Sequence, residues 1–252
     1  MEHTDAEWQD FEEISYREIQ SLSLRLTSED REQASSSAEE LVDLLLILSD
    51  DARRQAQIGE IDSLRNGFAH LLCHGDENAQ YWACLALSYI AHRNATNIRL
   101  IGRTPHIFRG LLRCLQSTES RGVACGVLSQ LAFCNRENGE AIADTEGLLE
   151  SLASVVQDGR AGDRQAATCV LSNCAANSKH VALRISRVPG MIQALKRLCA
   201  TAATEDTAPG GDARAAVSAI GCMDNLSHYQ EVRPLLKAAG VPEALAAAME
   251  KE

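Results

Sequence analysis

Apolar, small and polar residues recur in a fixed order about every 42 residues. The clearest copy runs from Ala166 to Leu195 and reads AATCVLSNCAANSKHVALRISRVPGMIQAL. The order is a helix rich in small residues, a polar break, a short helix ending in Ile, a Gly/Pro turn and another apolar helix. A unit this short cannot bury its own apolar face, so the pattern predicts a solenoid of stacked copies.

Five copies align on the first apolar residue of the phrase that reads Leu-Ser-Asn in the fourth copy, which we call the anchor. The anchors lie 42, 41, 43 and 52 residues apart, at Leu45, Leu87, Leu128, Leu171 and Met223. Thirteen or fourteen residues after each anchor comes an apolar residue, at Ile58, Ile101, Ile142, Ile185 and Leu236. Turn residues follow, which predicts the end of one helix and the start of the next. They are Gly59, Pro105, Gly147, Gly190 and Gly240.

The pattern predicts one continuous repeat domain over residues 14–252. We expect helical units at about 30–75, 76–117, 118–159, 163–200 and 212–252, with a polar loop at 201–211. An amphipathic helix from Ile14 to Leu26 would cap the first unit, and residues 1–13 read as an acidic disordered lead-in. A capping-box pattern predicts that a helix begins, or begins afresh, near Ser37.

Three phrases resemble the armadillo repeat family. They are LSQLAFCNRENGEAIADTEGLLESL from Leu128, LSNCAANS from Leu171 and DNLSHYQEVRPLLKAAGVPEAL from Asp224. The resemblance covers roughly Asp30 to the C-terminus. It implies an all-α, right-handed α-α superhelix of about five repeats. It also implies a non-enzymatic scaffold or adaptor that binds a segment of another protein in a concave groove.

The resemblance also implies a peptide-binding column two residues after each anchor, where the family commonly has Asn. One carboxamide can both donate to and accept from a peptide backbone. Here the column reads Ile47, Tyr89, Gln130, Asn173 and Asn225, so its last two members match the family. Helical spacing adds His92, Phe133 and His228, three residues further on, and Trp82, seven before Tyr89. The alternative is that Trp82, Tyr89 and Phe133 pack between helices.

Charge is distributed unevenly along the chain. Its net charge is −11, and residues 1–60 hold 16 acidic against 5 basic residues. Asp43 and Asp50 would make the groove entrance acidic, which favours a protein or peptide partner with basic residues. A milder basic stretch between Ala86 and Ala200 reads as a solvated helix surface, so we expect no nucleic-acid ligand.

Cysteine usage and the missing signals fit an intracellular protein. The chain has nine Cys and neither a signal peptide nor a membrane anchor, so we expect the cytoplasm, with the nucleus left open. Repeat positions predict four of them as small buried core residues: Cys73, Cys84, Cys114 and Cys125. His70 and His74 flank Cys73 at metal-ligand spacing, but further ligands are lacking, so we expect no metal and no cofactor.

Two other functions remain as alternatives. The chain could be a structural or chaperone-like subunit of a larger assembly, acting through its convex face or its acidic N-terminal arm. It could also be a helical-repeat enzyme, for which Asp224 is the one candidate carboxylate, but no known catalytic motif is present. Partner and oligomeric state are not indicated by the sequence.

Overall fold

The described chain is helical outside its turns. The structure is a computed structural model that describes residues 16–48, 52–201 and 212–242. These ranges contain no strand, so the predicted all-α fold is confirmed. Residues 1–13, Asp50 and all but the first residue of the predicted loop 201–211 lie outside the described residues. None of the described helices is long and apolar enough to cross a membrane.

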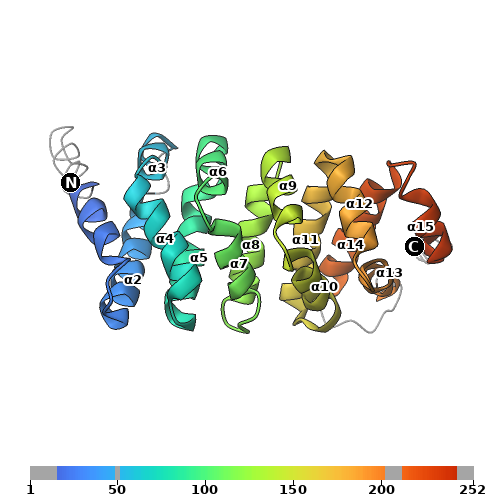
Figure 1. The fold of residues 1–252 in the computed structure, drawn as a ribbon, viewed down its shortest axis with the longest axis horizontal. Helices are drawn as coiled ribbons and strands as arrows, with labels where there is room; N and C mark the ends of the chain where they lie inside the picture. The colour runs from blue at the N-terminus through green and yellow to red at the C-terminus, as the bar shows by residue number, and fades with distance from the viewer. Residues whose placement is uncertain (1–15, 49–51, 202–211, 243–252) are drawn as a thin grey trace, which may run out of the picture. The chain divides into compact units, whose positions relative to one another are not determined.

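Helices of three classes alternate along the chain (Figure 1). The first helices follow the polar break and are α3 (Ala52–Gly59), α6 (Ala95–Gly102), α9 (Arg136–Asp144), α12 (Lys179–Arg187) and α15 (Arg233–Ala238). The second helices follow the turn and are residues 16–25, α4 (Asp62–His74), α7 (Ile107–Cys114), α10 (Leu148–Asp158) and α13 (Met191–Thr201). The third helices carry the anchors and are α2 (Arg31–Leu48), α5 (Glu77–Ala91), α8 (Arg121–Ala132), α11 (Ala161–Asn177) and α14 (Asp212–Ser227).

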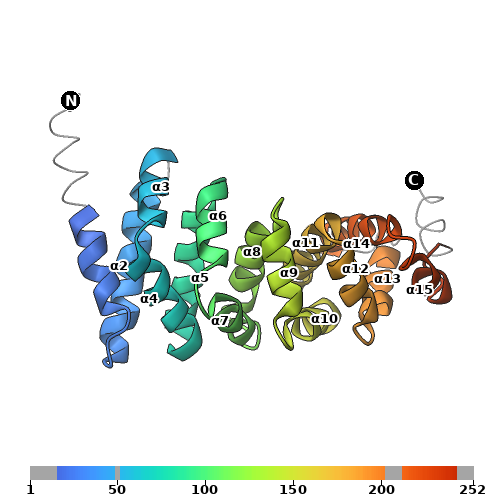
Figure 2. The same ribbon diagram turned by 45° about the horizontal axis from the view of Figure 1, so that its top comes forward.

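The helices group into two compact units, residues 1–123 and 124–252. In the first unit α2 packs on α5, α3 on α6 and α4 on α7. In the second unit α9 packs on α12, α10 on α13 and α11 on α14, and Figure 2 shows the same helices from another direction. In each of these six pairs a helix packs on the helix of its own class in the next copy, as expected when similar modules bury their apolar faces against one another.

The two apolar columns found in the sequence form the core. All five anchors are at most 2% exposed, and the residues of the Ile column are at most 4% exposed. Full burial of an aliphatic side chain of this size contributes about 1.5–3 kcal/mol. The recurrence of both columns therefore reflects the packing of successive copies.

The start of α2 differs from the prediction. The helix begins at Arg31 and runs through the serine-rich stretch, in which Ser37 is buried. Asp30 caps it, because Asp30 Oδ1 accepts the backbone N–H groups of Glu32 and Gln33 at 3.1 and 3.2 Å. The predicted start near Ser37 is wrong because this carboxylate already satisfies the exposed donors of the helix before that point.

A buried polar network joins the first helices of the first unit to α5. Gln55 in α3 donates through Nε2 to the carbonyl oxygens of Tyr89 and His92, both at 2.8 Å. Asn97 in α6 is fully buried, and its Nδ2 donates to the carbonyl oxygens of Gln55 at 2.7 Å and Ile90 at 2.8 Å. The bonds to Tyr89, Ile90 and His92 supply donors to carbonyl groups at the C-terminal end of α5, where the helix itself offers few N–H partners.

An Asn-x-x-Asn sequence builds this connection in both units. Asn94 Oδ1 accepts the backbone N–H of Asn97 at 3.0 Å and caps α6, and Asn135 does the same for Asn138 and α9 at 3.0 Å. Asn138 Nδ2 then donates to the carbonyl oxygen of Leu131 at 2.9 Å. The first Asn starts the helix, and the second ties it to the preceding third helix.

Second helices of the first unit approach one another closely at glycine. Gly67 in α4 lies against Leu26, and Gly110 in α7 lies against Leu72. A Cβ added to Gly110 would stand 2.5 Å from Leu72 Cβ, a separation that real Cβ atoms do not adopt. Only glycine therefore fits at this crossing without a shift of the helices.

None of the nine cysteines forms a disulfide. Cys84, Cys114 and Cys125 are buried, as their repeat positions predict. Cys73 is only half-buried, and its thiol lies 3.8 Å from the carbonyl oxygen of His106, to which it donates. The prediction of a core residue is wrong for Cys73 because this position lines a cavity on the surface of the first unit.

Three thiols in the second unit make stability sensitive to alkaline pH. Burial raises the pKa of Cys174 to about 12 and that of Cys199 to about 11, and it also raises the pKa of Cys222. The folded chain keeps these protons at a pH where an unfolded thiol, with a pKa of 9.0, releases them. The stabilisation is complete below pH 9 and is lost as the pH rises toward the folded values.

We expect each of these three thiols to lower the free energy of unfolding, measured by urea denaturation, by about 1.4 kcal/mol from about pH 8 to about pH 10. A Cys174→Ala variant lacks one of the buried thiols and should lose less over the same range. Equal losses in the two proteins would show that this thiol does not contribute to the pH dependence.

Candidate functional site

The polar column of the second unit lies on its third helices. Gln130 on α8, Asn173 on α11 and Asn225 on α14 are all half-buried, so part of each side chain reaches the surface. Phe133 and His228 are exposed immediately after the ends of α8 and α14. We call this surface the third-helix face, defined by Gly126, Gln130, Phe133, Cys169, Asn173, Gly221, Asn225 and His228.

Two asparagines of the face tie neighbouring third helices together in the same way. Asn173 Nδ2 donates to the backbone oxygen of Ser129 at 3.0 Å and to its Oγ at 3.1 Å, which joins α11 to α8. One copy later, Asn225 Nδ2 donates to the backbone oxygen and the Oγ of Ser172, both at 3.1 Å, which joins α14 to α11. Each carboxamide is therefore held in a defined orientation.

The nitrogen and the oxygen of each carboxamide have different roles. The nitrogen donates within the chain, whereas no described residue donates a hydrogen bond to Oδ1 of Asn173 or Asn225. The sequence-based hypothesis gave each Asn both a donor and an acceptor role toward a peptide. In this geometry Oδ1 is the group best placed to accept an N–H from outside.

The positions four residues before the column are small. They are Gly126 in α8, Cys169 in α11 and Gly221 in α14. A glycine inside a helix costs about 1 kcal/mol relative to alanine. A Cβ on Gly126 would meet no described atom within 4 Å, and one on Gly221 would meet only Ser172 Oγ, at 3.9 Å. Packing of the described residues therefore does not require either glycine, and both leave helix backbone open to close approach.

A shallow cavity of about 320 Å³ lies between α11 and α14. Val217 in its lining is 69% exposed. Arg214 and Ser218, also in the lining, share a helical face with Gly221 and Asn225, because these four residues follow one another at spacings of three or four. The third-helix face thus continues along α14 into this cavity.

Ring side chains lie beside the column at the C-terminal ends of the third helices. Phe133 is 61% exposed, which makes its ring available for contact with another molecule. His228 Nδ1 donates to the carbonyl oxygen of Asp224 at 2.9 Å, which leaves Nε2 as the acceptor of the neutral ring. The apolar ring of Phe133 and the hydrogen-bonding ring of His228 therefore border the polar column.

The first unit carries the remaining residues predicted for the site. Trp82 and Tyr89 on α5 are half-buried, whereas Asp43 and His92 are exposed. Trp82 Nε1 is buried without a hydrogen bond to any described residue, and its ring meets the neighbouring tyrosine edge-on with centroids 5.3 Å apart. Ile47 is 62% exposed at the column position of α2. The column of this unit is therefore partly apolar.

The sequence-based candidates for catalysis and for metal binding are Asp224 and the pair His70 and His74. Asp224 is exposed, so it lacks the buried setting that would make it a catalytic carboxylate. His70 and His74 lie side by side with ring centroids 4.7 Å apart. Even so, the ranges described contain no group of three His, Cys, Asp or Glu side chains placed to hold a metal ion.

Two features of the third-helix face were not predicted from the sequence. Ser129 and Ser172 accept the asparagine bonds, and a signal for them exists because Ser88, Ser129 and Ser172 each directly follow an anchor. Gly126 and Gly221 stand at the same offset from the column, but their open surroundings become visible only in three dimensions.

Comparison with known proteins identifies the fold. No profile of a known protein family matches the chain, and no curated protein sequence matches it. Solved structures do match, each over 92% of this chain. An engineered protein is 21% identical, covered over 97% of its length, with a TM-score of 0.73.

Two of the matching structures are designed armadillo repeat proteins. One, in complex with the peptide (KR)4, is 18% identical and covered over 98% of its length, with a TM-score of 0.72. The other, computationally designed for modular peptide recognition, is 19% identical and covered over 99%, with a TM-score of 0.73. The chain is therefore an all-α repeat protein with the armadillo-like fold.

Proposed function

We propose that the third-helix face of the second unit binds an extended segment of another protein, and that the chain acts as a non-enzymatic scaffold or adaptor. The observation that carries this proposal is the pair Gly126 and Gly221. Each weakens its own helix, and neither is required by the packing of described residues. Close approach of the backbone of a bound peptide explains why both positions are glycine.

The neighbouring groups suit a peptide backbone. Oδ1 of Asn173 and Asn225 can accept N–H groups of an extended segment without reading its side chains. Phe133 and Val217 supply exposed apolar contacts, which contribute most when a partner covers them fully. The designed relatives with this fold include one in complex with a peptide, which is consistent with this use of the fold.

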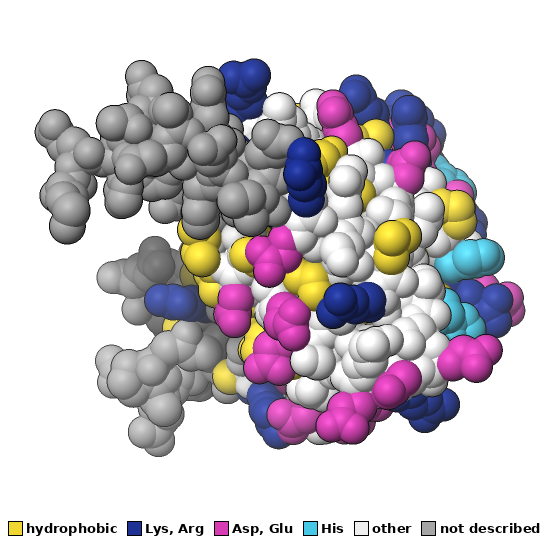
Figure 3. All heavy atoms as spheres, turned by 90° about the vertical axis from the view of Figure 1, so that its left-hand side faces the viewer, with side chains coloured by type: hydrophobic (Ala, Val, Ile, Leu, Met, Phe, Trp, Pro, Cys, Tyr) yellow, Lys and Arg dark blue, Asp and Glu magenta, His cyan; other side chains and the backbone are white. Residues whose placement is uncertain are grey.

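Acidic residues on the first unit favour a partner that also carries basic residues. Figure 3 shows acidic side chains gathered over the surface formed by the N-terminal part of this unit. The exposed acidic residues here include Glu18, Glu29, Asp30, Glu32, Glu39, Glu40 and Asp43. Such a surface accelerates association with a basic segment and fixes its direction more than it adds affinity. A cytoplasmic setting is part of the proposal, because nine cysteines without a disulfide suit a reducing compartment.

The test is a double variant, Gly126→Ala and Gly221→Ala, in which stability and binding should change in opposite directions. A peptide is first selected from a random library displayed against the wild-type chain. Because alanine favours a helix, we expect the free energy of unfolding to rise by about 1–2 kcal/mol. The added methyl groups obstruct the bound backbone, so affinity for the peptide, measured by calorimetry, should fall by about tenfold or more.

Gly139→Ala is the matched control. Gly139 lies on α9, a first helix, and an added Cβ would rest 3.7 Å from Cys174 Cα, an ordinary contact distance. This variant should keep the wild-type affinity. If the double variant gained stability and still bound the peptide like the wild type, the third-helix face would not be the binding surface.

A further inference from the structure

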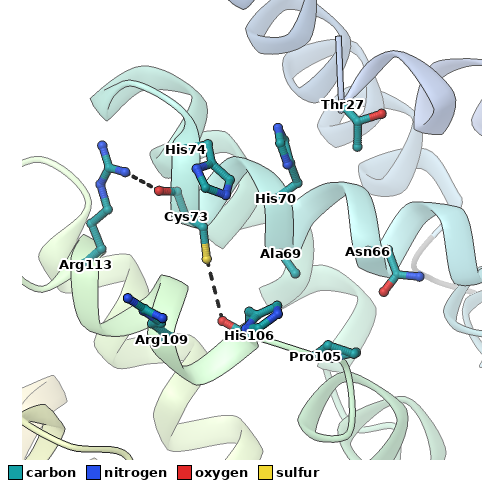
Figure 4. A pocket seen from close by; sticks show the side chains of 10 residues that line it. All are labelled: Thr27, Asn66, Ala69, His70, Cys73, His74, Pro105, His106, Arg109 and Arg113. Carbon is teal, nitrogen blue, oxygen red and sulfur yellow. Dashed lines mark hydrogen bonds between the residues drawn. The ribbon is translucent and has the colours of Figure 1, made fainter. Parts of the chain in front are cut away.

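A cavity of about 650 Å³ lies between the second helices α4 and α7 of the first unit (Figure 4). Besides Thr27 and Cys73, its lining includes six hydrogen-bonding side chains and no Asp or Glu among the residues described. The six are Asn66, His70 and His74 on the α4 side, and His106, Arg109 and Arg113 on the α7 side. Within a chain of net charge −11, this is a local excess of groups that bind anions.

Helical spacing directs both sets of side chains toward one space. On α4 the three residues follow one another at intervals of four; on α7 Arg109 and Arg113 are four residues apart, and His106 directly precedes the helix. Each set therefore lies along one side of its helix, and Figure 4 shows both sets around the same opening. The arrangement offers donors from two directions to a single ligand.

Arg109 and Arg113 supply positive charge to the cavity. Arg113 Nη1 donates to the carbonyl oxygen of Cys73 near the end of α4, which fixes its guanidinium at the edge of the cavity. Neither Arg109 nor Arg113 forms an ion pair with a carboxylate of the described residues. A guanidinium presents several N–H groups in one plane, a geometry that matches the oxygens of a phosphate.

His106 has an unusual backbone for its residue type. Its φ is 63°, in the left-handed region, whereas the corresponding turns of other copies use Gly147, Gly190 and Gly240 at φ 80°, 78° and 66°. A residue with a Cβ is disfavoured in this conformation, and glycine is not. Glycine would adopt this conformation at a lower conformational energy. A histidine here therefore costs conformational energy, at a position where its side chain lines the cavity.

We propose that this cavity binds the phosphate group of a small phosphate ester. The two arginines would repel a metal ion and attract an oxyanion. The volume lies in the range of about 300–1,000 Å³ that is usual for small-molecule sites, so it accommodates an organic group as well as the phosphate. The site is on the second helices and is independent of the third-helix face.

The direct test is calorimetry at constant ionic strength with O-phospho-L-serine, using L-serine as the ligand without phosphate. The wild-type chain should bind only the phosphorylated compound. Arg109→Gln should weaken binding by about tenfold or more, because a charge-assisted hydrogen bond is lost. Arg99→Gln removes the same charge from an exposed position of α6 outside the cavity lining and should leave the affinity unchanged.

His106→Gly separates a binding role from a structural one. This variant should bind O-phospho-L-serine several-fold more weakly, while its melting temperature stays the same or rises because the turn then has the residue that it favours. A fall in melting temperature with unchanged affinity would assign His106 to the fold instead of the ligand.

A histidine titration followed by NMR gives a second readout. Burial, and then the neighbouring His74, lower the pKa of His70. A smaller hollow that both histidines also line contains Glu29, Arg31 and Asp76, so these charged groups lie near His70 as well. A bound phosphate should raise the pKa of His70 in the wild-type chain but much less in Arg109→Gln.

Three outcomes would overturn the proposal. The first is no binding of O-phospho-L-serine, or equal binding of L-serine. The second is an equal loss of affinity in Arg109→Gln and Arg99→Gln, which indicates general attraction of anions. The third is a phosphoserine peptide that binds about tenfold or more tightly than free O-phospho-L-serine, which would assign the cavity to a phosphorylated protein. A peptide that binds equally or more weakly supports a small ester.

Discussion

Replacement of Asn97 by alanine is expected to lower the free energy of unfolding by about 3 kcal/mol. The fully buried Asn97 donates to the carbonyl oxygens of Gln55 and Ile90, and alanine would leave both oxygens without this donor. Each buried polar group left unsatisfied costs about 1–3 kcal/mol. Asn97 Oδ1 accepts no hydrogen bond from the described residues, so its removal offsets part of the loss.

Urea denaturation of Asn97→Ala and Asn94→Ala side by side measures this effect. Asn94 is half-exposed; it caps α6 and donates to Gln55 Oε1 at 3.3 Å, so its loss should cost only about 1 kcal/mol. Equal losses in the two variants would mean that the connection from α6 to α3 and α5 contributes little beyond the helix cap.

Gly110→Ala is expected to destabilise the chain by about 2 kcal/mol, although alanine is the better helix former by about 1 kcal/mol. The new Cβ would stand 2.5 Å from Leu72 Cβ, so α7 must move away from α4. The free energy of unfolding from urea denaturation measures the change.

The single variant Gly126→Ala is the control for this substitution. Gly126 also lies within a helix, but an added Cβ meets no described atom within 4 Å, so the free energy of unfolding should rise by about 0.5–1 kcal/mol. The two glycines are thus expected to respond with opposite signs. A gain of stability in Gly110→Ala would contradict the close crossing of α4 and α7.

The repeat was predictable because burial imposes the same residue types at each copy. The anchors and the Ile column are buried in every copy, and stacking of short amphipathic helices buries both columns repeatedly. The start of α2 was mispredicted because two capping signals compete within a few residues, and Asp30 takes the role that the pattern near Ser37 suggested.

The residues of the candidate site were partly accessible from the sequence. The positions of Asn173 and Asn225 on third helices follow from the repeat, but their bonds to Ser129 and Ser172 depend on how successive copies stack. The cavity between α4 and α7 was also beyond prediction. It joins side chains about 40 residues apart in sequence, and it exposes Cys73, whose repeat position suggests a core residue.

Hydrogen exchange followed by mass spectrometry, with and without the library-selected peptide, tests the binding surface most directly. If the peptide lies along the third helices, exchange should slow in α11 and α14 and remain unchanged in the second helices α10 and α13. Slower exchange confined to α10 and α13, with α11 and α14 unaffected, would place the peptide on the second helices and contradict the proposed function.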